Sequence, residues 1–156
     1  MSLEPKNTPD SPPEPPGAMA NVLIRRGTPE DAGFVFSYWL RDAFERCRTY
    51  RGMSKALFMR LHHLVLERVV SRSILHVACD PEAPEVVYGF VCAEPNASPP
   101  ILHYIYVKRR FRRCGIARQL LAAAGCGASF WFTHLTDDGV GLRKKFPLAE
   151  YVPYAI

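Results

Sequence analysis

The chain has 156 residues, of which 48% are apolar and 22% are charged, and its formal net charge is +5. These values are typical of a single globular domain, and no apolar run approaches the ~18 residues that a membrane span requires. The N-terminus also lacks the basic start and apolar core of a secretory signal, so we expect a cytoplasmic protein.

Residues 1–18 are rich in proline and contain almost no apolar side chain. Such a segment cannot bury enough surface to fold, so we expect a disordered tail over residues 1–18. The remaining residues, 19–156, have the composition of one folded domain. Met1 and Met19 are both candidate start residues.

The first half of the domain predicts one strand followed by two helices. Residues 22–24 form a short apolar strand, and Thr28-Pro29-Glu30-Asp31 is typical of a helix start. That helix is expected to continue to about Arg46. A second helix is predicted from Lys55 to about Val70, with a buried stripe at helical spacing formed by Leu57, Leu61, Leu64 and Val65.

The second half predicts strands over residues 74–79, 86–94 and 101–107, a helix over 118–124 and a strand over 130–134. A short helix around 139–145 and a last strand near 151–155 complete the chain. In the strand at 101–107, strict alternation would place His103, Ile105 and Val107 on one face. The order β-α-α-β-β-β-α-β-α-β indicates a mixed α/β (α+β) domain.

Residues 101–118 are the most informative segment. An apolar strand ends at Val107, a basic turn follows, and Gly115 precedes a helix. The first amides of a helix have no partner within the helix, and the helix dipole favours negative charge at that end. The positive charge concentrated at residues 108–113 would neutralise a bound anion. This arrangement predicts a phosphorylated cofactor.

The segment resembles the pyrophosphate motif of the GNAT superfamily of N-acetyltransferases, which reads Arg or Gln, two residues, Gly, one residue, then Gly or Ala. Here the motif is Arg112-Arg113-Cys114-Gly115-Ile116-Ala117. Val107 lies five residues before it, and Phe111 occupies the usual aromatic position. Residues 24–31 also resemble the first strand and helix start of the family. The resemblance implies a mostly antiparallel mixed sheet, flanked by helices, with splayed central strands.

The resemblance further implies acetyl-CoA as co-substrate and no metal. The backbone amides of residues 112–117 would hold the pyrophosphate, with charge-assisted contacts from Arg112 and Arg113. Lys108, Arg109 and Arg118 are weaker candidates for contact with the other phosphate, and a solvated basic turn is the alternative for residues 108–110. The strand gap would accept the pantetheine arm. The expected cofactor-binding residues are Ile105, Tyr106, Val107, Arg112, Arg113, Cys114, Gly115, Ile116 and Ala117.

Acetyl transfer to an amine requires a base, because most aliphatic amines are protonated at neutral pH. His103 is one candidate, since some members of the family place a catalytic histidine at the matching position; the other interpretation is a hydrogen-bonded core histidine. Glu94 is a second candidate base or a surface acid, and His134 is a third. The adjacent pair His62-His63 is expected at the surface.

The chain departs from the family after His134, because Arg143 stands where many members have the tyrosine that protonates the thiolate. A GNAT-fold module that binds acyl-CoA or a protein without turnover is therefore an alternative to an enzyme. A nucleic-acid binder is a further one, but only Phe111 is aromatic within the basic run.

The acceptor class is open: a small molecule or a protein amine. We expect no membrane partner and treat a homodimer as a candidate assembly. The five cysteines are scattered, which favours reduced thiols over a zinc site.

Overall fold

The structure, a computed structural model, describes residues 21–156. The predicted tail over residues 1–18 therefore lies outside the described residues. The elements follow the predicted order and are β1 (Leu23–Arg26), α1 (Ala32–Arg46), α2 (Lys55–Arg72), β2 (Ile74–Cys79), β3 (Val87–Glu94), β4 (Ile101–Val107), α3 (Ile116–Ala123), β5 (Ser129–Phe132), α4 (Asp137–Lys145) and β6 (Leu148–Tyr151).

One six-stranded sheet runs in the order β1-β2-β3-β4-β5-β6. Strands β1 to β4 are antiparallel neighbours, whereas β4 pairs in parallel with β5, and β5 with β6. The predicted mixed and mostly antiparallel sheet is confirmed. The last strand covers residues 148–151 instead of 151–155, because the chain turns at Pro153, which has no N–H to continue a ladder.

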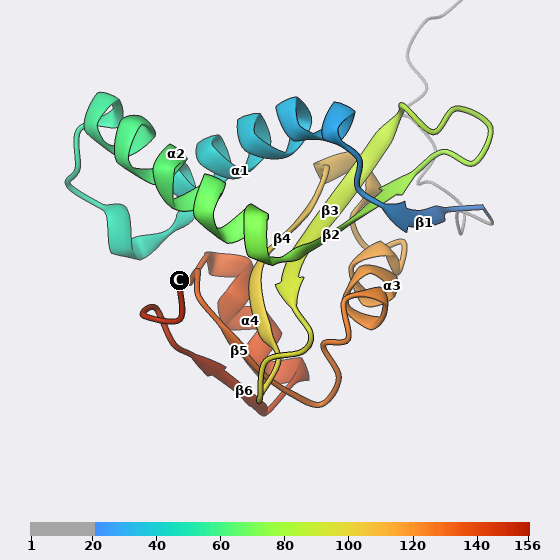
Figure 1. The fold of residues 1–156 in the computed structure, drawn as a ribbon. Coiled ribbons are helices and arrows are strands. Elements are labelled where there is room, and N and C mark those ends of the chain that lie inside the picture. The colour runs from blue at the N-terminus through green and yellow to red at the C-terminus, as the bar shows by residue number, and fades with distance from the viewer. Residues whose placement is uncertain (1–20) are drawn as a thin grey trace, which may run out of the picture.

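Helices cover both faces of the sheet (Figure 1). On one face, α1 and α2 bury Trp39 and Phe58 against side chains of the central strands, including Phe90 and Tyr104. On the other face, α3 and α4 pack on a second apolar cluster that contains Leu120. The sheet thus separates two apolar cores. A ligand bound between β4 and β5 would contact both of them.

Strands β4 and β5 separate almost as soon as they meet. Their register pairs only Ile101 with Trp131 and Leu102 with Phe132. The main-chain bonds at this junction are Trp131 N–H to Pro100 O, at 2.8 Å, and Thr133 N–H to Leu102 O, at 3.1 Å. Beyond Leu102 the two strands diverge, which confirms the predicted splay.

A β-bulge interrupts β4 at His103. The ladder pairs Cys92 with Tyr104 and Ala93 with Leu102, so His103 has no opposite residue on β3. The extra residue reverses the alternation. Leu102, rather than His103, joins Ile105 and Val107 in the core on the α3 side. The prediction that His103, Ile105 and Val107 share one face is therefore wrong.

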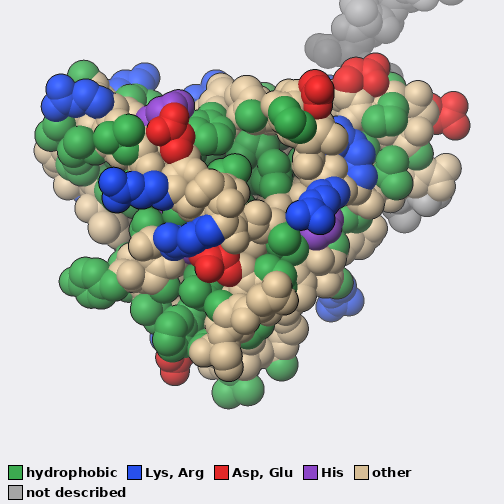
Figure 2. Space-filling model, in the orientation of Figure 1, with side chains coloured by type: hydrophobic (Ala, Val, Ile, Leu, Met, Phe, Trp, Pro, Cys, Tyr) green, Lys and Arg blue, Asp and Glu red, His purple; other side chains and the backbone are tan. Residues whose placement is uncertain are grey.

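The buried stripe of α2 also differs from the prediction. Leu57, Leu61 and Leu64 are 39%, 45% and 53% exposed, and Figure 2 shows apolar side chains on the surface over this helix. The buried residues are Phe58, His62, Leu66 and Val69. Both sets have helical spacing, so periodicity alone does not distinguish them. His62, expected at the surface, is only 4% exposed because it lies on the inward stripe.

This reassignment predicts effects of very different size at two nearby positions of α2. Phe58→Ala should lower the free energy of unfolding by ~3–5 kcal/mol, because it removes a fully buried ring and leaves a cavity. Leu61→Ala should change it by less than about 1 kcal/mol, since that side chain is half exposed. Urea denaturation of both variants measures the difference, and equal losses would contradict the assignment.

Candidate functional site

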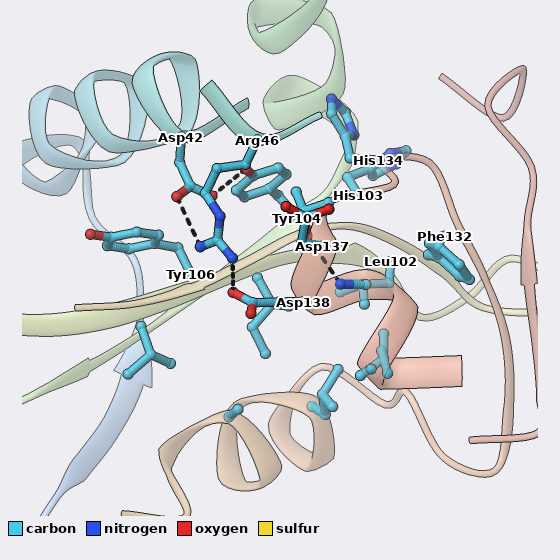
Figure 3. Close-up of a pocket in the computed structure, with 18 of the residues that line it drawn as sticks. Asp42, Arg46, Leu102, His103, Tyr104, Tyr106, Phe132, His134, Asp137 and Asp138 are labelled. Atoms are coloured by element: carbon cyan, nitrogen blue, oxygen red, sulfur yellow. Dashed lines mark hydrogen bonds and ion pairs between the residues drawn. The ribbon is translucent and has the colours of Figure 1, made fainter. Parts of the chain in front are cut away.

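A cavity of about 410 Å³ occupies the gap where β4 and β5 diverge (Figure 3). One wall comes from β4, another from α3 and α4, and a third from the C-terminal end of α1. Its lining residues are Asp42, Arg46, Leu102, His103, Tyr104, Ile105, Tyr106, Val107, Arg112, Ala117, Leu121, Phe132, His134, Thr136, Asp137, Asp138, Gly139, Gly141, Leu142 and Lys145.

The turn between β4 and α3 presents unpaired amides at one end of this cavity. Among the described residues, the backbone N–H groups of residues 113–118 have no main-chain acceptor. Arg113 and Gly115 have φ values of 66° and 78°, a left-handed conformation that favours glycine. The space where a Cβ of Gly115 would lie is open. A successive run of free N–H groups at a helix N-terminus is suited to an anion.

The arginines of the motif have different surroundings. Arg112 donates from Nε to the carbonyl oxygen of Val107, at 3.0 Å, and its Nη1 lies 3.5 Å from Asp138. Its guanidinium thus holds the end of β4, and its predicted phosphate contact stays a prediction. Arg113 has no ion pair among the described residues. Lys108 Nζ lies 4.9 Å from the centroid of the Phe34 ring of α1.

The free edge of β4 faces the cavity. Lys108 N–H donates to Tyr88 O of β3, at 2.8 Å, so alternation directs the main-chain groups of Tyr106 to β3 as well. Those of Ile105 and Val107 point into the gap instead. Of these, the Val107 carbonyl is taken by Arg112, whereas its N–H remains free. Tyr106 lines the cavity, but its main-chain groups are used in the ladder with β3.

His103 and Glu94, the two candidate bases, are brought together. His103 Nε2 donates to Glu94 Oε1 at 2.7 Å, and Arg72 Nε donates to the same oxygen at 2.7 Å. Burial acts to raise the pKa of Glu94, but the bonds from Arg72 and His103 outweigh it and leave this pKa lowered. Burial lowers the pKa of His103, although Glu94 opposes the shift. The pair is a neutral imidazole against a carboxylate.

The network continues from His103 into the α2 side of the sheet. His103 Nδ1 lies 3.3 Å from Thr133 Oγ1, which lies 2.9 Å from His134 Nδ1. His134 Nε2 in turn lies 3.1 Å from His62 Nε2. Burial lowers the pKa of His62 to about 4 and that of His134 well below its usual range. The sequence analysis did not predict Thr133 or His62 as residues of the site. The four-residue spacing of His62 from Phe58 and from Leu66 was the one feature of the sequence that could have indicated that His62 is buried.

Charged side chains bridge the cavity between α1 and α4, as Figure 3 shows. Arg46 pairs with Asp42 on its own helix and with Asp138 at the start of α4. Asp42 also accepts a hydrogen bond from Tyr104 OH at 2.6 Å. Nothing in the sequence pattern indicated this cluster, because its members come from distant segments.

No tyrosine of α4 or β6 reaches the cavity within the described residues. Arg143, which the sequence predicts at the place of the family's tyrosine, is exposed and lies outside the lining. Tyr151 OH is 3.0 Å from Thr49 Oγ1, and Tyr154 is 95% exposed. The lining phenols come from β4 instead, at Tyr104 and Tyr106.

The cysteines fall into two groups. Burial raises the pKa of Cys47 and Cys92 to about 12 and that of Cys126 to about 11, and it also raises the pKa of Cys79. Cys114, in the turn of free amides, is the one that is not fully buried. Within residues 21–156, no three His, Cys, Asp or Glu side chains are grouped to hold a metal ion.

No protein-family model matches the chain, and no curated protein sequence matches it. Solved structures do match. A candidate acetyl transferase from Pyrococcus furiosus is 16% identical, with a TM-score of 0.55 over 85% of this chain and 80% of that one. YjaB from Escherichia coli, in its apo form, is 19% identical, with a TM-score of 0.55 over 81% of each chain.

A predicted acetyltransferase from Clostridium acetobutylicum, solved with acetyl-CoA, is 13% identical, with a TM-score of 0.52 over 81% of this chain and 88% of that one. At these identities the likeness establishes the fold, which is the GNAT fold that the resemblance implied. In the part of the chain that the structure describes, no helix is long and apolar enough to cross a membrane.

The buried histidines predict a loss of stability in mild acid. Because the folded-state pKa values of His62, His103 and His134 lie below 6.5, the unfolded chain binds more protons as the pH falls. The stabilisation is complete above pH 6.5 and, for His62, is lost as the pH falls toward 4. Each histidine should contribute a slope of about 1.4 kcal/mol per pH unit within its window.

Urea denaturation at pH 7.5, 6 and 5 measures this slope. His62→Gln should reduce it, because the substitution removes a histidine whose pKa burial lowers to about 4. Equal unfolding free energies at pH 7.5 and pH 5 in the wild-type protein would show that the histidines are not buried as neutral groups.

Proposed function

We propose that this protein is an acetyl-CoA-dependent N-acetyltransferase that acetylates a primary amine. The observation that carries the proposal is the run of free amides at residues 113–118, which opens onto the cavity between β4 and β5. The shared fold with solved acetyltransferases, one of them holding acetyl-CoA, supports it.

In this proposal the turn holds the pyrophosphate of acetyl-CoA. The amides of residues 113–117 and the Arg113 side chain would supply donors and positive charge. The pantetheine arm would lie along the free edge of β4, whose open main-chain groups belong to Ile105 and Val107. An N–H on this edge would donate to the thioester oxygen as negative charge develops there.

The base in this proposal is His103, oriented by Glu94. The carboxylate accepts from Nε2, so the lone pair of the neutral ring lies on Nδ1. As the amine attacks the thioester carbon, a proton passes from the amine nitrogen to His103, directly or through a water. Glu94 stabilises the imidazolium that results. The leaving thiolate does not strictly need an acid, because the pKa of a thiol is not far above neutral.

Three carboxylates, Asp42, Asp137 and Asp138, line the cavity on the side of α1 and α4. They favour a cationic acceptor such as an amine that competes with Arg46 for Asp42 and Asp138. Mass spectrometry of amine pools incubated with isotopically labelled acetyl-CoA would identify the acceptor. Protein lysines, N-termini, polyamines, aminoglycosides and amino sugars are the pools to compare.

One observation favours a second function, a module that binds acyl-CoA without turnover. In the described residues, α4 contributes no tyrosine to the cavity, and Arg143 is exposed and does not line it. The two functions separate in one measurement. A module would bind acetyl-CoA and leave every amine pool unlabelled, whereas an enzyme would transfer the label. Figure 2 shows Lys and Arg side chains in separate groups on the viewed face, which is unlike a continuous nucleic-acid surface.

Acetyl-CoA should raise the melting temperature of the wild-type protein, because it binds the folded state selectively. Gly115→Asp should abolish this shift, since it places a side chain and a negative charge in the open space beside the amides. Gly52→Asp is the matched control, because Gly52 is exposed, has a left-handed φ of 92° like Gly115, and has open space where a Cβ would lie. A wild-type shift in Gly115→Asp would remove the turn from the proposal.

His103→Gln should lower kcat by roughly 10²–10⁴-fold while the dissociation constant for acetyl-CoA stays unchanged. Glu94→Gln should also lower kcat, because the imidazolium loses its carboxylate partner. Steady-state kinetics and calorimetric titration measure the two quantities separately. A wild-type kcat in His103→Gln would leave His103 as a hydrogen-bonded core residue.

A further inference from the structure

Three histidines from separate parts of the chain meet around the hydroxyl of Thr133. Thr133 Oγ1 lies 2.9 Å from His134 Nδ1 and 3.3 Å from His103 Nδ1, and His134 Nε2 lies 3.1 Å from His62 Nε2. All four residues are buried, with exposures between 1% and 7%. A catalytic base needs only His103 and the Glu94 carboxylate, so the hydrogen bonds that link His103 through Thr133 and His134 to His62 require their own explanation.

The position of the proton on His103 is determined by Glu94. The carboxylate can only accept, so the neutral ring carries its hydrogen on Nε2 and its lone pair on Nδ1. Among the described residues, the donor in reach of Nδ1 is the Thr133 hydroxyl. The basic nitrogen of the proposed catalyst is therefore the one that Thr133 faces.

The Thr133 hydroxyl has a single proton and three acceptors within reach. They are His103 Nδ1 and the His103 carbonyl oxygen, both at 3.3 Å, and His134 Nδ1, at 2.9 Å. It can serve His103 only if His134 Nδ1 is itself protonated and donates to Thr133. His134 has that tautomer when its Nε2 accepts a hydrogen bond from His62 Nε2. His62 thus determines His134, and His134 determines Thr133.

Two protonation states of His103 are then equally well bonded. With the ring neutral, the Thr133 hydroxyl donates to Nδ1. With the ring protonated, Nδ1–H donates to Thr133 Oγ1, and the hydroxyl turns to the His103 carbonyl oxygen at the same distance, 3.3 Å. The bonds of Glu94, His134 and His62 stay as they are. Only one hydroxyl hydrogen has to rotate.

We infer that Thr133, His134 and His62 are positioning residues that let His103 gain and lose a proton at Nδ1 without losing a hydrogen bond. During acetyl transfer, the Thr133 hydroxyl turns to the His103 carbonyl oxygen and frees the Nδ1 lone pair. An N–H bond of the attacking amine then breaks, its electron pair stays on the amine nitrogen, and the proton bonds to the freed Nδ1 lone pair. The catalytic meaning of this arrangement rests on the proposed function, whereas the bonding pattern can be tested without it.

Few other charged groups face this series of hydrogen-bonded residues, which runs from Glu94 through His103, Thr133 and His134 to His62. Glu94 of β3 and Arg72 of α2 act on His103. The Tyr50, Tyr104 and Trp39 rings pack around His134. The titration of His103 should therefore respond mainly to Glu94, Arg72 and the Thr133 hydroxyl.

The first experiment is nitrogen-15 NMR of the histidine rings in the wild-type protein at neutral pH, which reports the protonated nitrogen of each ring. The expected result is a proton on Nε2 of His103, on Nδ1 of His134 and on Nε2 of His62. A proton on Nε2 of His134 would overturn the inference, because that tautomer would take the Thr133 hydrogen for its own Nδ1.

The second experiment compares Thr133→Val with Thr133→Ser. Valine keeps the volume and removes the hydroxyl, so the neutral and the protonated ring each lose a hydrogen bond. Because the bond made by the charged imidazolium is the stronger of the two, the NMR titration of His103 should move to lower pH. The acid limb of the kcat/KM profile should move with it, and kcat should fall on the order of ten- to a hundredfold at unchanged KM for acetyl-CoA. Thr133→Ser should recover the wild-type titration and most of kcat.

A second pair of variants tests the far end of the chain. His62→Gln can still donate an amide N–H to His134 Nε2, whereas His62→Phe cannot. The Nδ1–H tautomer of His134 should persist in the first variant and be lost in the second. An unchanged tautomer in His62→Phe would overturn the role of His62.

The outcomes separate the two proposals. If the wild-type protein transfers no acetyl group to any amine pool, the proposed function fails. The histidine tautomers and the Thr133→Val titration still test whether Thr133, His134 and His62 position the proton on His103. If the wild-type protein is active and Thr133→Val keeps the wild-type titration and pH profile, the positioning chain fails and the acetyltransferase remains.

Discussion

The divergence of β4 from β5 after Leu102 is the constraint on which the rest of the site depends. If the two strands paired over their full length, the cavity would not exist and the main-chain groups of Ile105 and Val107 would be used in the ladder. Three features hold them apart. The bulge at His103 changes the course of β4, Arg112 occupies the Val107 carbonyl, and the chain leaves β5 after Phe132 to begin α4. The free amides of the following turn then face an open space.

The polar network beneath the cavity has an energetic meaning as well. A buried polar side chain that lacks a partner costs roughly 1–3 kcal/mol, and apolar replacements of the same shape would often be as stable. The chain of Glu94, His103, Thr133, His134 and His62 satisfies its members through one another. Stability alone does not require three neutral histidines in a core, which agrees with the proton-transfer role that we propose for the network.

Local patterns predicted most of the fold, and long-range packing accounts for what they missed. The strands at 74–79 and 101–107 and the start of α2 at Lys55 follow directly from composition and turn residues. The buried face of α2 could not be predicted in this way. The set that contains Leu61 and the set that contains His62 both have helical spacing, and only the tertiary structure shows which of them is buried. The bulge at His103 was equally hidden, since it depends on the register with β3. For the same reason the sequence identified His103 and Glu94 as separate candidates but did not predict their contact. It did not predict the ion pair between Arg46 and Asp138 either.

Cys114, in the turn between β4 and α3, is the one cysteine that a thiol reagent in solution can reach, because the other four are buried. Cys47, Cys79, Cys92 and Cys126 lie in the cores, where burial holds them as protonated thiols. Cys114 lies between Arg113 and Gly115, within the stretch of free amides. A soluble alkylating or fluorescent reagent would therefore attach at a single native position, so that the rate of attachment reports, without any engineered label, whether an anion covers the turn.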